Sequence, residues 1–146
     1  IPGSATLVLN CRFYDDDVKA RTYTAIERVV RGECIASGCE KEPTFTYSNH
    51  GELTDNSPEV FGKVRPLFDA VFDDASVDAQ RWTASEDFSE VPRAFGVPYF
   101  FWLIGANSDD ADAPGNHMPD FIPDYEPVVS ASNRAALAAV LAYLAV

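Results

Sequence analysis

Residues 97–105 read Val-Pro-Tyr-Phe-Phe-Trp-Leu-Ile-Gly, and this nearly continuous apolar run decides the expected fold. A run of this length without polar alternation is typical of a β-strand that is covered on both faces, as in a parallel α/β sheet. We therefore expect residues 97–105 to form a strand of such a sheet.

The sequence on either side of this run alternates between helix and strand patterns. Ser57 and Pro58 begin an amphipathic helix, since serine caps helices and proline is favoured at the first helical position. Residues 80–84 are a short candidate strand, and Ser85 is expected to cap a short helix after it. An alanine-rich helix is expected over residues 130–145. This order predicts the C-terminal helix–strand part of a parallel α/β domain.

The N-terminal third has the pattern of a strand, a helix and a second strand. Residues 5–13 and 41–47 alternate in side-chain character, as strands do. Three aspartates, residues 15–17, precede an amphipathic helix that ends at Gly38. Adjacent carboxylates can bind a metal, but ahead of such a helix we expect them to cap it and to complement its dipole. This two-layer unit has a thin core and is expected to pair with strands outside the chain.

The composition limits the partners. The 146 residues include 23 acidic and 11 basic side chains, which give a net charge of −12. Such a charge repels nucleic acid and anionic membranes, so neither is expected as a partner. No apolar run approaches the roughly 20 residues that a membrane span needs. The three cysteines lack CxxC spacing, which predicts reduced, mostly buried thiols in a cytoplasmic protein.

Two polar clusters carry the candidate chemistry. Glu86 with Asp87, and His117 with Asp120, each follow a predicted strand. Ends of neighbouring parallel strands lie about 4.7–4.9 Å apart, so these loops are expected to share one crevice. One histidine and one or two carboxylates form part of a metal site, whereas zinc generally takes three or four protein ligands. The second histidine, His50, lies in a polar link and is expected to be solvated.

Several motifs in this order resemble the aminoacylase and hippurate hydrolase-like metallo-amidohydrolases. Indole-acetyl-amino-acid hydrolases and the dinuclear zinc carboxypeptidases belong to the same superfamily. Residues 85–88 match the family's S-E-D-F identically, and residues 117–121 match its late H-x-P-x-F. Residues 1–12, 56–59 and 98–105 are similar to three further family motifs. The resemblance covers essentially the whole chain.

The resemblance implies the C-terminal portion of a metal-dependent amidohydrolase or metallopeptidase. Its substrates would be N-acyl amino acids, such as hippurate, or small peptides. Residues 1–47 would form a partial lid domain, residues 48–58 a linker, and residues 59–146 the C-terminal part of the catalytic domain. The lid unit in this superfamily is often a dimerisation surface, so a homodimer or an edge-paired oligomer is expected.

The resemblance also implies roles for four residues. His117 would hold one of the two divalent metal ions (Zn, or Mn, Co or Ni) of the full-length enzyme. Glu86 and Asp87 would lie beside the active site, where carboxylates orient a metal-bound histidine or the substrate. Arg12 is a candidate for gripping the substrate carboxylate, with an ion-paired surface arginine as the alternative. Met118 replaces a small residue of the family, which leaves the substrate preference open.

The family's other metal ligands and its general-base glutamate would lie N-terminal to this chain. We therefore expect no catalytic residue here, no bound metal, and no activity of the chain alone. Two other interpretations remain open. One is a non-catalytic dimerisation or binding module of acidic α/β type, and the other is a standalone cytoplasmic regulatory domain.

Overall fold

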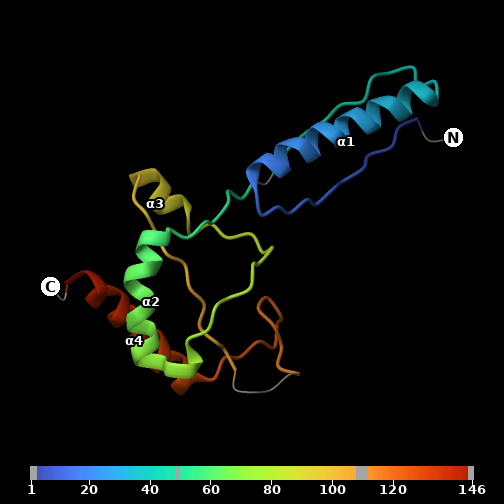
Figure 1. The fold of residues 1–146 in the computed structure, drawn as a ribbon. Helices are drawn as coiled ribbons and strands as arrows, with labels where there is room; N and C mark the ends of the chain where they lie inside the picture. Colours follow the sequence, from blue (N-terminus) through green and yellow to red (C-terminus); the bar gives the residue numbers. More distant parts are fainter. Residues whose placement is uncertain (1–2, 49, 108–111, 145–146) are drawn as a thin grey trace. The chain divides into compact units, whose positions relative to one another are not determined.

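The structure is a computed structural model that describes residues 3–48, 50–107 and 112–144. The chain divides into two compact units (Figure 1). Unit 1 contains Ile1–Thr54 and Arg81–Glu90, and unit 2 contains Asp55–Gln80 and Val91–Val146.

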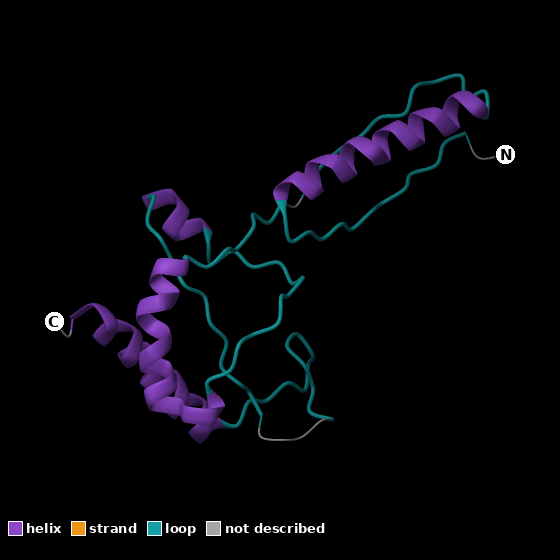
Figure 2. Ribbon diagram, viewed as in Figure 1, coloured by secondary structure: helices purple, strands orange, loops and turns teal. Residues whose placement is uncertain are grey.

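The described residues form helices and connecting segments, without any strand (Figure 2). The predicted α/β fold, with a two-layer strand–helix–strand unit and a parallel sheet, is therefore wrong. The division into a lid unit, a linker and a catalytic part stays a prediction.

Unit 1 is organised around helix α1, Asp16–Ala36. Asp15 caps this helix, because its carboxylate accepts a hydrogen bond from the backbone N–H of Val18 at 2.8 Å. Two more aspartates occupy the first turn, where negative charge favours the helix dipole. The capping role predicted for residues 15–17 is confirmed. At the other end Gly38 has a φ of 68°, and the helix stops there as predicted.

Residues 5–13 and 41–47, which were predicted as strands, run along α1 without pairing to a strand (Figure 1), and residues 80–84 form no strand either. The Phe13 and Tyr23 rings have centroids 5.6 Å apart, and the Tyr23 and Tyr47 rings 5.1 Å. A strand is defined by hydrogen bonds to a neighbouring strand. Residues 5–13 and 41–47 contact the helix through side chains instead. The alternating sequence correctly predicts that one side of each segment packs against other residues. It does not determine whether a neighbouring strand is present.

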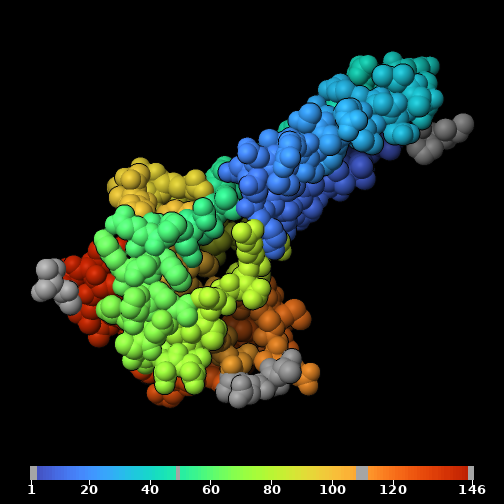
Figure 3. All heavy atoms as spheres, viewed as in Figure 1, coloured from blue at the N-terminus to red at the C-terminus, as the bar shows by residue number. Residues whose placement is uncertain are grey.

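Unit 1 therefore has a poorly covered apolar surface. No residue of α1 is buried, and atoms of the helix are visible along its length in the space-filling view (Figure 3). Leu7 is 74% exposed and Val8 is 87% exposed, although they point to opposite sides in an alternating segment. A unit of this size buries a smaller fraction of its surface than a larger domain does.

Unit 2 contains the helices α2, Pro58–Phe72, and α4, Tyr125–Leu144. Ser57 caps α2 by accepting a hydrogen bond from the N–H of Val60, and Pro58 occupies the first turn, as predicted. Helix α4 begins five residues before the predicted start. Pro127 lies in its first turn, where the missing N–H breaks no helical hydrogen bond.

Two short helical elements complete the described structure. The 3-10 turn η1, Asp73–Ala75, follows α2 directly. Helix α3, Glu90–Phe95, occupies the place of the short helix predicted after residue 85.

The core of unit 2 lies between α2 and α4, which run side by side (Figure 1). Val64 and Phe68 of α2 are buried against Ala135 and Ala138 of α4. Alanine side chains are small, so the backbone of α4 can approach the larger side chains of α2 closely.

The apolar run at residues 97–105 packs on this core with one face only. The ring centroids of Phe68 and Trp102 lie 5.6 Å apart, and those of Phe68 and Phe100 lie 6.1 Å apart. Leu103 is 53% exposed. The prediction of a strand covered on both faces is wrong, because the described residues supply a helical layer on one face and no sheet neighbours.

The side chain of Asn56 makes hydrogen bonds to the backbone of residues 97–105, as a neighbouring strand would do. Its Oδ1 accepts from the backbone N–H of Phe101 at 2.6 Å, and its Nδ2 donates to the Phe101 carbonyl at 2.9 Å. The backbone N–H of Ser57 donates to the Tyr99 carbonyl at 2.9 Å. These bonds satisfy partly buried backbone groups that would otherwise be costly.

Helix α4 is long and apolar enough to cross a membrane by length and composition. Ala135 and Ala138 of this helix are buried against α2, but only 11% of its apolar stretch is buried in the structure. We expected no uninterrupted apolar run near the roughly 20 residues of a membrane span. Helix α4 reaches this length because it is rich in alanine and includes only two charged residues, Glu126 and Arg134. The absence of a membrane partner stays a prediction.

Candidate functional site

His117 lies in a tight turn of unit 2. The backbone N–H of Met118 donates to the Gly115 carbonyl at 3.2 Å, which closes the turn around His117. His117 has a φ of 69° and is exposed. A non-glycine residue with this backbone conformation is uncommon, and such strain often occurs at functional sites. The exposed imidazole can reach a ligand from solvent.

Glu86 and Asp87 lie in unit 1, at the turn that leads into α3. The Glu86 carboxylate accepts from the backbone N–H of Asp87 at 3.0 Å and of Phe88 at 3.4 Å. The carbonyl of Asp87 accepts from the N–H of Glu90 at 3.0 Å. Both carboxylates are exposed. Glu86 thus bonds to the chain that follows it, while the Asp87 side chain lies at the surface of the turn.

Ser85 was predicted to cap the short helix, and this prediction is wrong. Its hydroxyl oxygen accepts from Arg12 Nη1 at 3.3 Å, and the same nitrogen donates to the Thr83 carbonyl at 2.7 Å. Helix α3 begins only at Glu90, after the turn that Asp87 closes. The serine hydroxyl therefore serves a contact between distant parts of unit 1.

Arg12 is joined by this contact to the segment that carries Glu86 and Asp87. Both acceptors, a carbonyl and a hydroxyl, are uncharged. A guanidinium has five N–H donors, and these two bonds use Nη1 alone. Arg12 can therefore donate to a further group without giving up its contact with Ser85.

The four predicted site residues are divided between the two units. Arg12, Glu86 and Asp87 belong to unit 1, and His117 belongs to unit 2. The crevice expected between their loops was inferred from neighbouring parallel strands, and the described residues contain none. Within residues 3–48, 50–107 and 112–144, no three His, Cys, Asp or Glu side chains gather as a metal-binding group. The roles of the four residues stay predictions.

Ser89 is a feature that the sequence did not reveal. It is fully buried, and its hydroxyl has no hydrogen-bond partner in the described protein. A buried hydroxyl without a partner costs about 1–3 kcal/mol. The sequence around Ser89 has no pattern that predicts a buried serine. Its burial results from tertiary packing.

A groove lies in unit 1, and none of the four predicted site residues contributes to its lining. It has a volume of about 570 Å³ between the segment that includes Leu7 and Leu9 and the face of α1 that includes Val18 and Val29. Its remaining lining is Arg21, Thr22, Ala25, Ile26 and Val30. The lining is apolar except for Arg21 and Thr22, so it suits an apolar ligand or side chain.

Unit 1 also contains a smaller cavity of about 120 Å³, which shares Leu9 and Ile26 with the lining of this groove. Cys11, Tyr23, Tyr47 and His50 contribute to its lining, so the predicted solvated His50 is exposed but also borders a cavity. Tyr47 donates a hydrogen bond to the Glu27 carboxylate at 2.6 Å, and this bond raises the pKa of the Tyr47 phenol.

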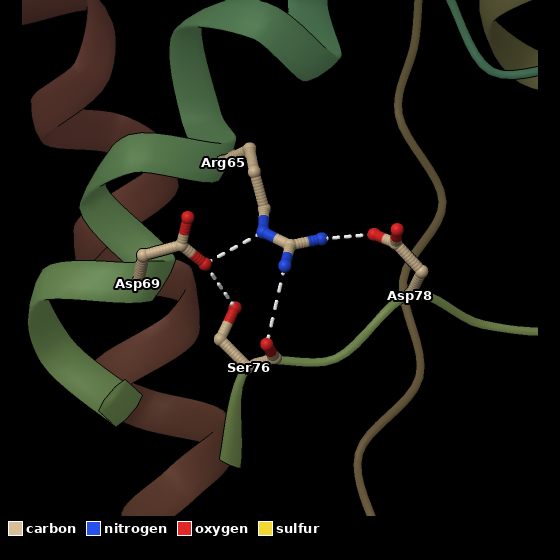
Figure 4. A network of polar contacts seen from close by, with 4 residues as sticks. All are labelled: Arg65, Asp69, Ser76 and Asp78. Carbon is tan, nitrogen blue, oxygen red and sulfur yellow. Dashed lines mark hydrogen bonds and ion pairs between the residues drawn. The ribbon is translucent and has the colours of Figure 1, made fainter. Parts of the chain in front are cut away.

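A polar network closes the end of α2 in unit 2 (Figure 4). Arg65 Nε donates to Asp69 at 2.6 Å, Arg65 Nη1 donates to Asp78, and Arg65 Nη2 donates to the Ser76 carbonyl at 3.2 Å. The Ser76 hydroxyl also donates to Asp69 at 2.7 Å. Every member is thus engaged in holding the loop after α2, which makes the network structural.

Comparison with models of protein families finds none that matches the chain.

Proposed function

We propose that this chain is part of a metal-dependent amidohydrolase that cleaves the amide bond of N-acyl amino acids. The observation that carries the proposal is the contact between Arg12 and Ser85, which joins a cation to the Ser85-Glu86-Asp87-Phe88 motif within unit 1. The sequence motifs that resemble the amidohydrolases support the assignment of the reaction.

In this proposal Arg12 binds the carboxylate of the amino acid. Its guanidinium matches the geometry of a carboxylate, and charge-assisted hydrogen bonds of this type are among the stronger ones. Glu86 and Asp87 carry negative charge near the same segment. In this proposal they lie beside the active site and orient the metal-bound histidine or the substrate.

His117 is the proposed metal ligand of this chain, and the remaining ligands and the general base come from outside it. Two divalent metal ions, when bound, would polarise the scissile carbonyl and activate water. A histidine side chain in an exposed turn is suited to such a role. The chain alone is accordingly proposed to hydrolyse no substrate.

Binding of hippurate to the 146-residue chain, followed by ligand-observed NMR, tests the proposal. Hippurate should bind, and its uncharged amide should bind roughly tenfold more weakly or not at all, because the ion pair with Arg12 is lost. Arg12→Met should remove the difference between the two ligands. Arg81→Met is the matched control, since Arg81 lies in the same unit against the Tyr14 ring.

Equal binding of hippurate and its amide to the unaltered chain would contradict the role of Arg12. Hydrolysis of hippurate by the chain alone with added zinc would contradict the assignment of the other ligands to a different part of the enzyme. Loss of that hydrolysis in His117→Ala but not in His50→Ala would still leave His117 as a ligand.

A second candidate function is that of a dimerisation or binding module. The exposure of Leu7 and Val8 favours it, because apolar side chains on both sides of one segment leave a surface that a partner can cover. Light scattering after size exclusion tests self-association. Leu7→Asp should weaken it roughly tenfold or more, since burying a leucine contributes about 1.5–3 kcal/mol.

Val77→Asp is the matched control for this second candidate. Val77 is 74% exposed, as is Leu7, and the substitution adds the same charge in unit 2. Equal effects of the two substitutions would show that added charge, and not the surface around Leu7, controls association. A monomer at every concentration would exclude self-association as the function.

A further inference from the structure

Cys34 and Cys39 stand at the C-terminal end of α1. The backbone N–H of Cys39 donates to the Cys34 carbonyl at 2.9 Å, and the N–H of Gly38 donates to the Ile35 carbonyl at 3.1 Å. Gly38 between them has a φ of 68°. These two bonds around a left-handed glycine form a Schellman motif, a common helix C-terminus.

This motif brings two particular side chains together. The residue at the position of Cys34 and the residue at the position of Cys39 frequently make an apolar contact across the helix end. Here both carry thiols, and the Cys39 side chain lies within hydrogen-bonding reach of Cys34. Five positions separate the pair in sequence, but the local backbone places them as neighbours.

Both thiols can be reached from solvent. Cys39 is exposed and Cys34 is half-buried, which corrects the prediction of mostly buried thiols. The hydrogen bond with Cys39, together with partial burial, raises the pKa of the Cys34 thiol. Cys34 therefore keeps its proton to a higher pH than a free thiol does, and the exposed Cys39 is the side chain that reacts first.

We propose that Cys34 and Cys39 form a reversible disulfide by exchange with a small-molecule disulfide. In the first step the Cys39 thiolate attacks one sulfur of the small disulfide, forms a mixed disulfide and releases one small thiol. Cys34 then loses its proton and attacks the Cys39 sulfur, which forms the protein disulfide and releases the second small thiol. Two protein thiols are oxidised, one small disulfide is reduced, and the two protons pass to the released thiols.

The disulfide would tie the returning chain to α1. Residues after Cys39 already contact the helix, since Arg31 pairs with Glu42 at 3.4 Å and lies 5.0 Å from the centre of the Phe45 ring. A covalent link at Cys39 fixes the start of this returning segment. Oxidation would therefore restrict opening of the helix end, and reduction would restore it.

The test uses oxidised glutathione and the unaltered chain. Trypsin cleaves after Arg31 and Lys41, so both cysteines fall in one peptide, residues 32–41. After oxidation this peptide should lose two hydrogen atoms and accept no alkylating reagent, and free thiols should fall from three to one. Dithiothreitol should return all three thiols. Cys11→Ser is the control and should leave the change in this peptide unaltered.

Gly38→Ala tests whether the helix end drives the reaction. Alanine meets no atom within 4 Å at this position, so it adds backbone strain without a steric clash. A left-handed alanine is disfavoured enough to slow closure roughly tenfold. Closure of this variant at the rate of the unaltered chain would overturn the role of the motif. Glutathione retained on either cysteine, or disulfides between chains, would overturn the proposed pair.

Discussion

Asp69 accepts two hydrogen bonds that stabilise its charged form. The bond from the Ser76 hydroxyl, at 2.7 Å, is the larger cause that lowers the pKa of Asp69, and the bond from Arg65 Nε is the next. The folded state therefore holds this carboxyl ionised at a pH where an unfolded chain begins to protonate it. Stability from this source is fully present above the unfolded pKa and is lost as pH falls through the folded pKa.

Asp69→Asn should destabilise the chain at pH 7, because the amide offers Arg65 and Ser76 a neutral acceptor in place of a carboxylate. The difference from the unaltered chain should begin to shrink as pH falls below about 4, where Asp69 of the unfolded chain becomes protonated, and should vanish as pH falls through the lower pKa of the folded state. Urea unfolding at a series of pH values measures this. Asp74→Asn is the matched control, and an equal, pH-independent loss in both variants would contradict the role of the network.

Residue-level signals in the sequence were reliable where the chemistry is local. Asp15 and Ser57 cap helices as predicted, because a cap needs only the few residues that follow it. The left-handed backbone of His117 was not predicted, because glycine or asparagine is the usual residue in that conformation. The candidate site rests on such individual residues, and its assembly depends on contacts that no local pattern encodes.

Helix α2 contains Pro66 in its interior, where it is exposed. Proline has no N–H to donate to the carbonyl of Gly62 one turn earlier. Pro66→Ala should therefore raise the free energy of unfolding by about 1–3 kcal/mol, since interior proline is about 3 kcal/mol less favourable than alanine. Thermal and urea unfolding measure the change.

Pro58→Ala is the control for this prediction. Pro58 lies in the first turn of the same helix, where no helical bond is lost and a fixed φ is favourable. We expect no gain from this substitution. A loss of stability in Pro66→Ala would show that proline at that position is required by the geometry of α2.

Elements that are helical in the sequence pattern are helical in the described structure, whereas the predicted strands are not strands. The run at residues 97–105 illustrates the reason. Trp102 packs against Phe68, and the backbone of Phe101 hydrogen-bonds to the side chain of Asn56. The run therefore obtains apolar packing and backbone hydrogen bonds without a neighbouring strand. A helix forms its hydrogen bonds within itself. A strand depends on a partner whose presence the segment's own sequence does not determine.

The whole chain combines a net charge of −12 with exposed apolar side chains. The charge opposes association at low salt, because the Debye length is about 30 Å at 0.01 M. The apolar surface of unit 1, which includes Leu7 and Val8, favours association at any salt concentration. Which of the two dominates depends on the ionic strength.

Self-association should therefore increase with sodium chloride. At about 1 M salt the Debye length falls to about 3 Å, so repulsion between copies is largely screened while the apolar attraction remains. Light scattering after size exclusion, at constant protein concentration over this range, measures the apparent mass. Leu7→Asp should keep a lower mass than Val77→Asp at high salt, where their equal charges no longer matter. An apparent mass that stays constant or falls with salt would show that charge pairs, and not apolar contacts, hold any oligomer together.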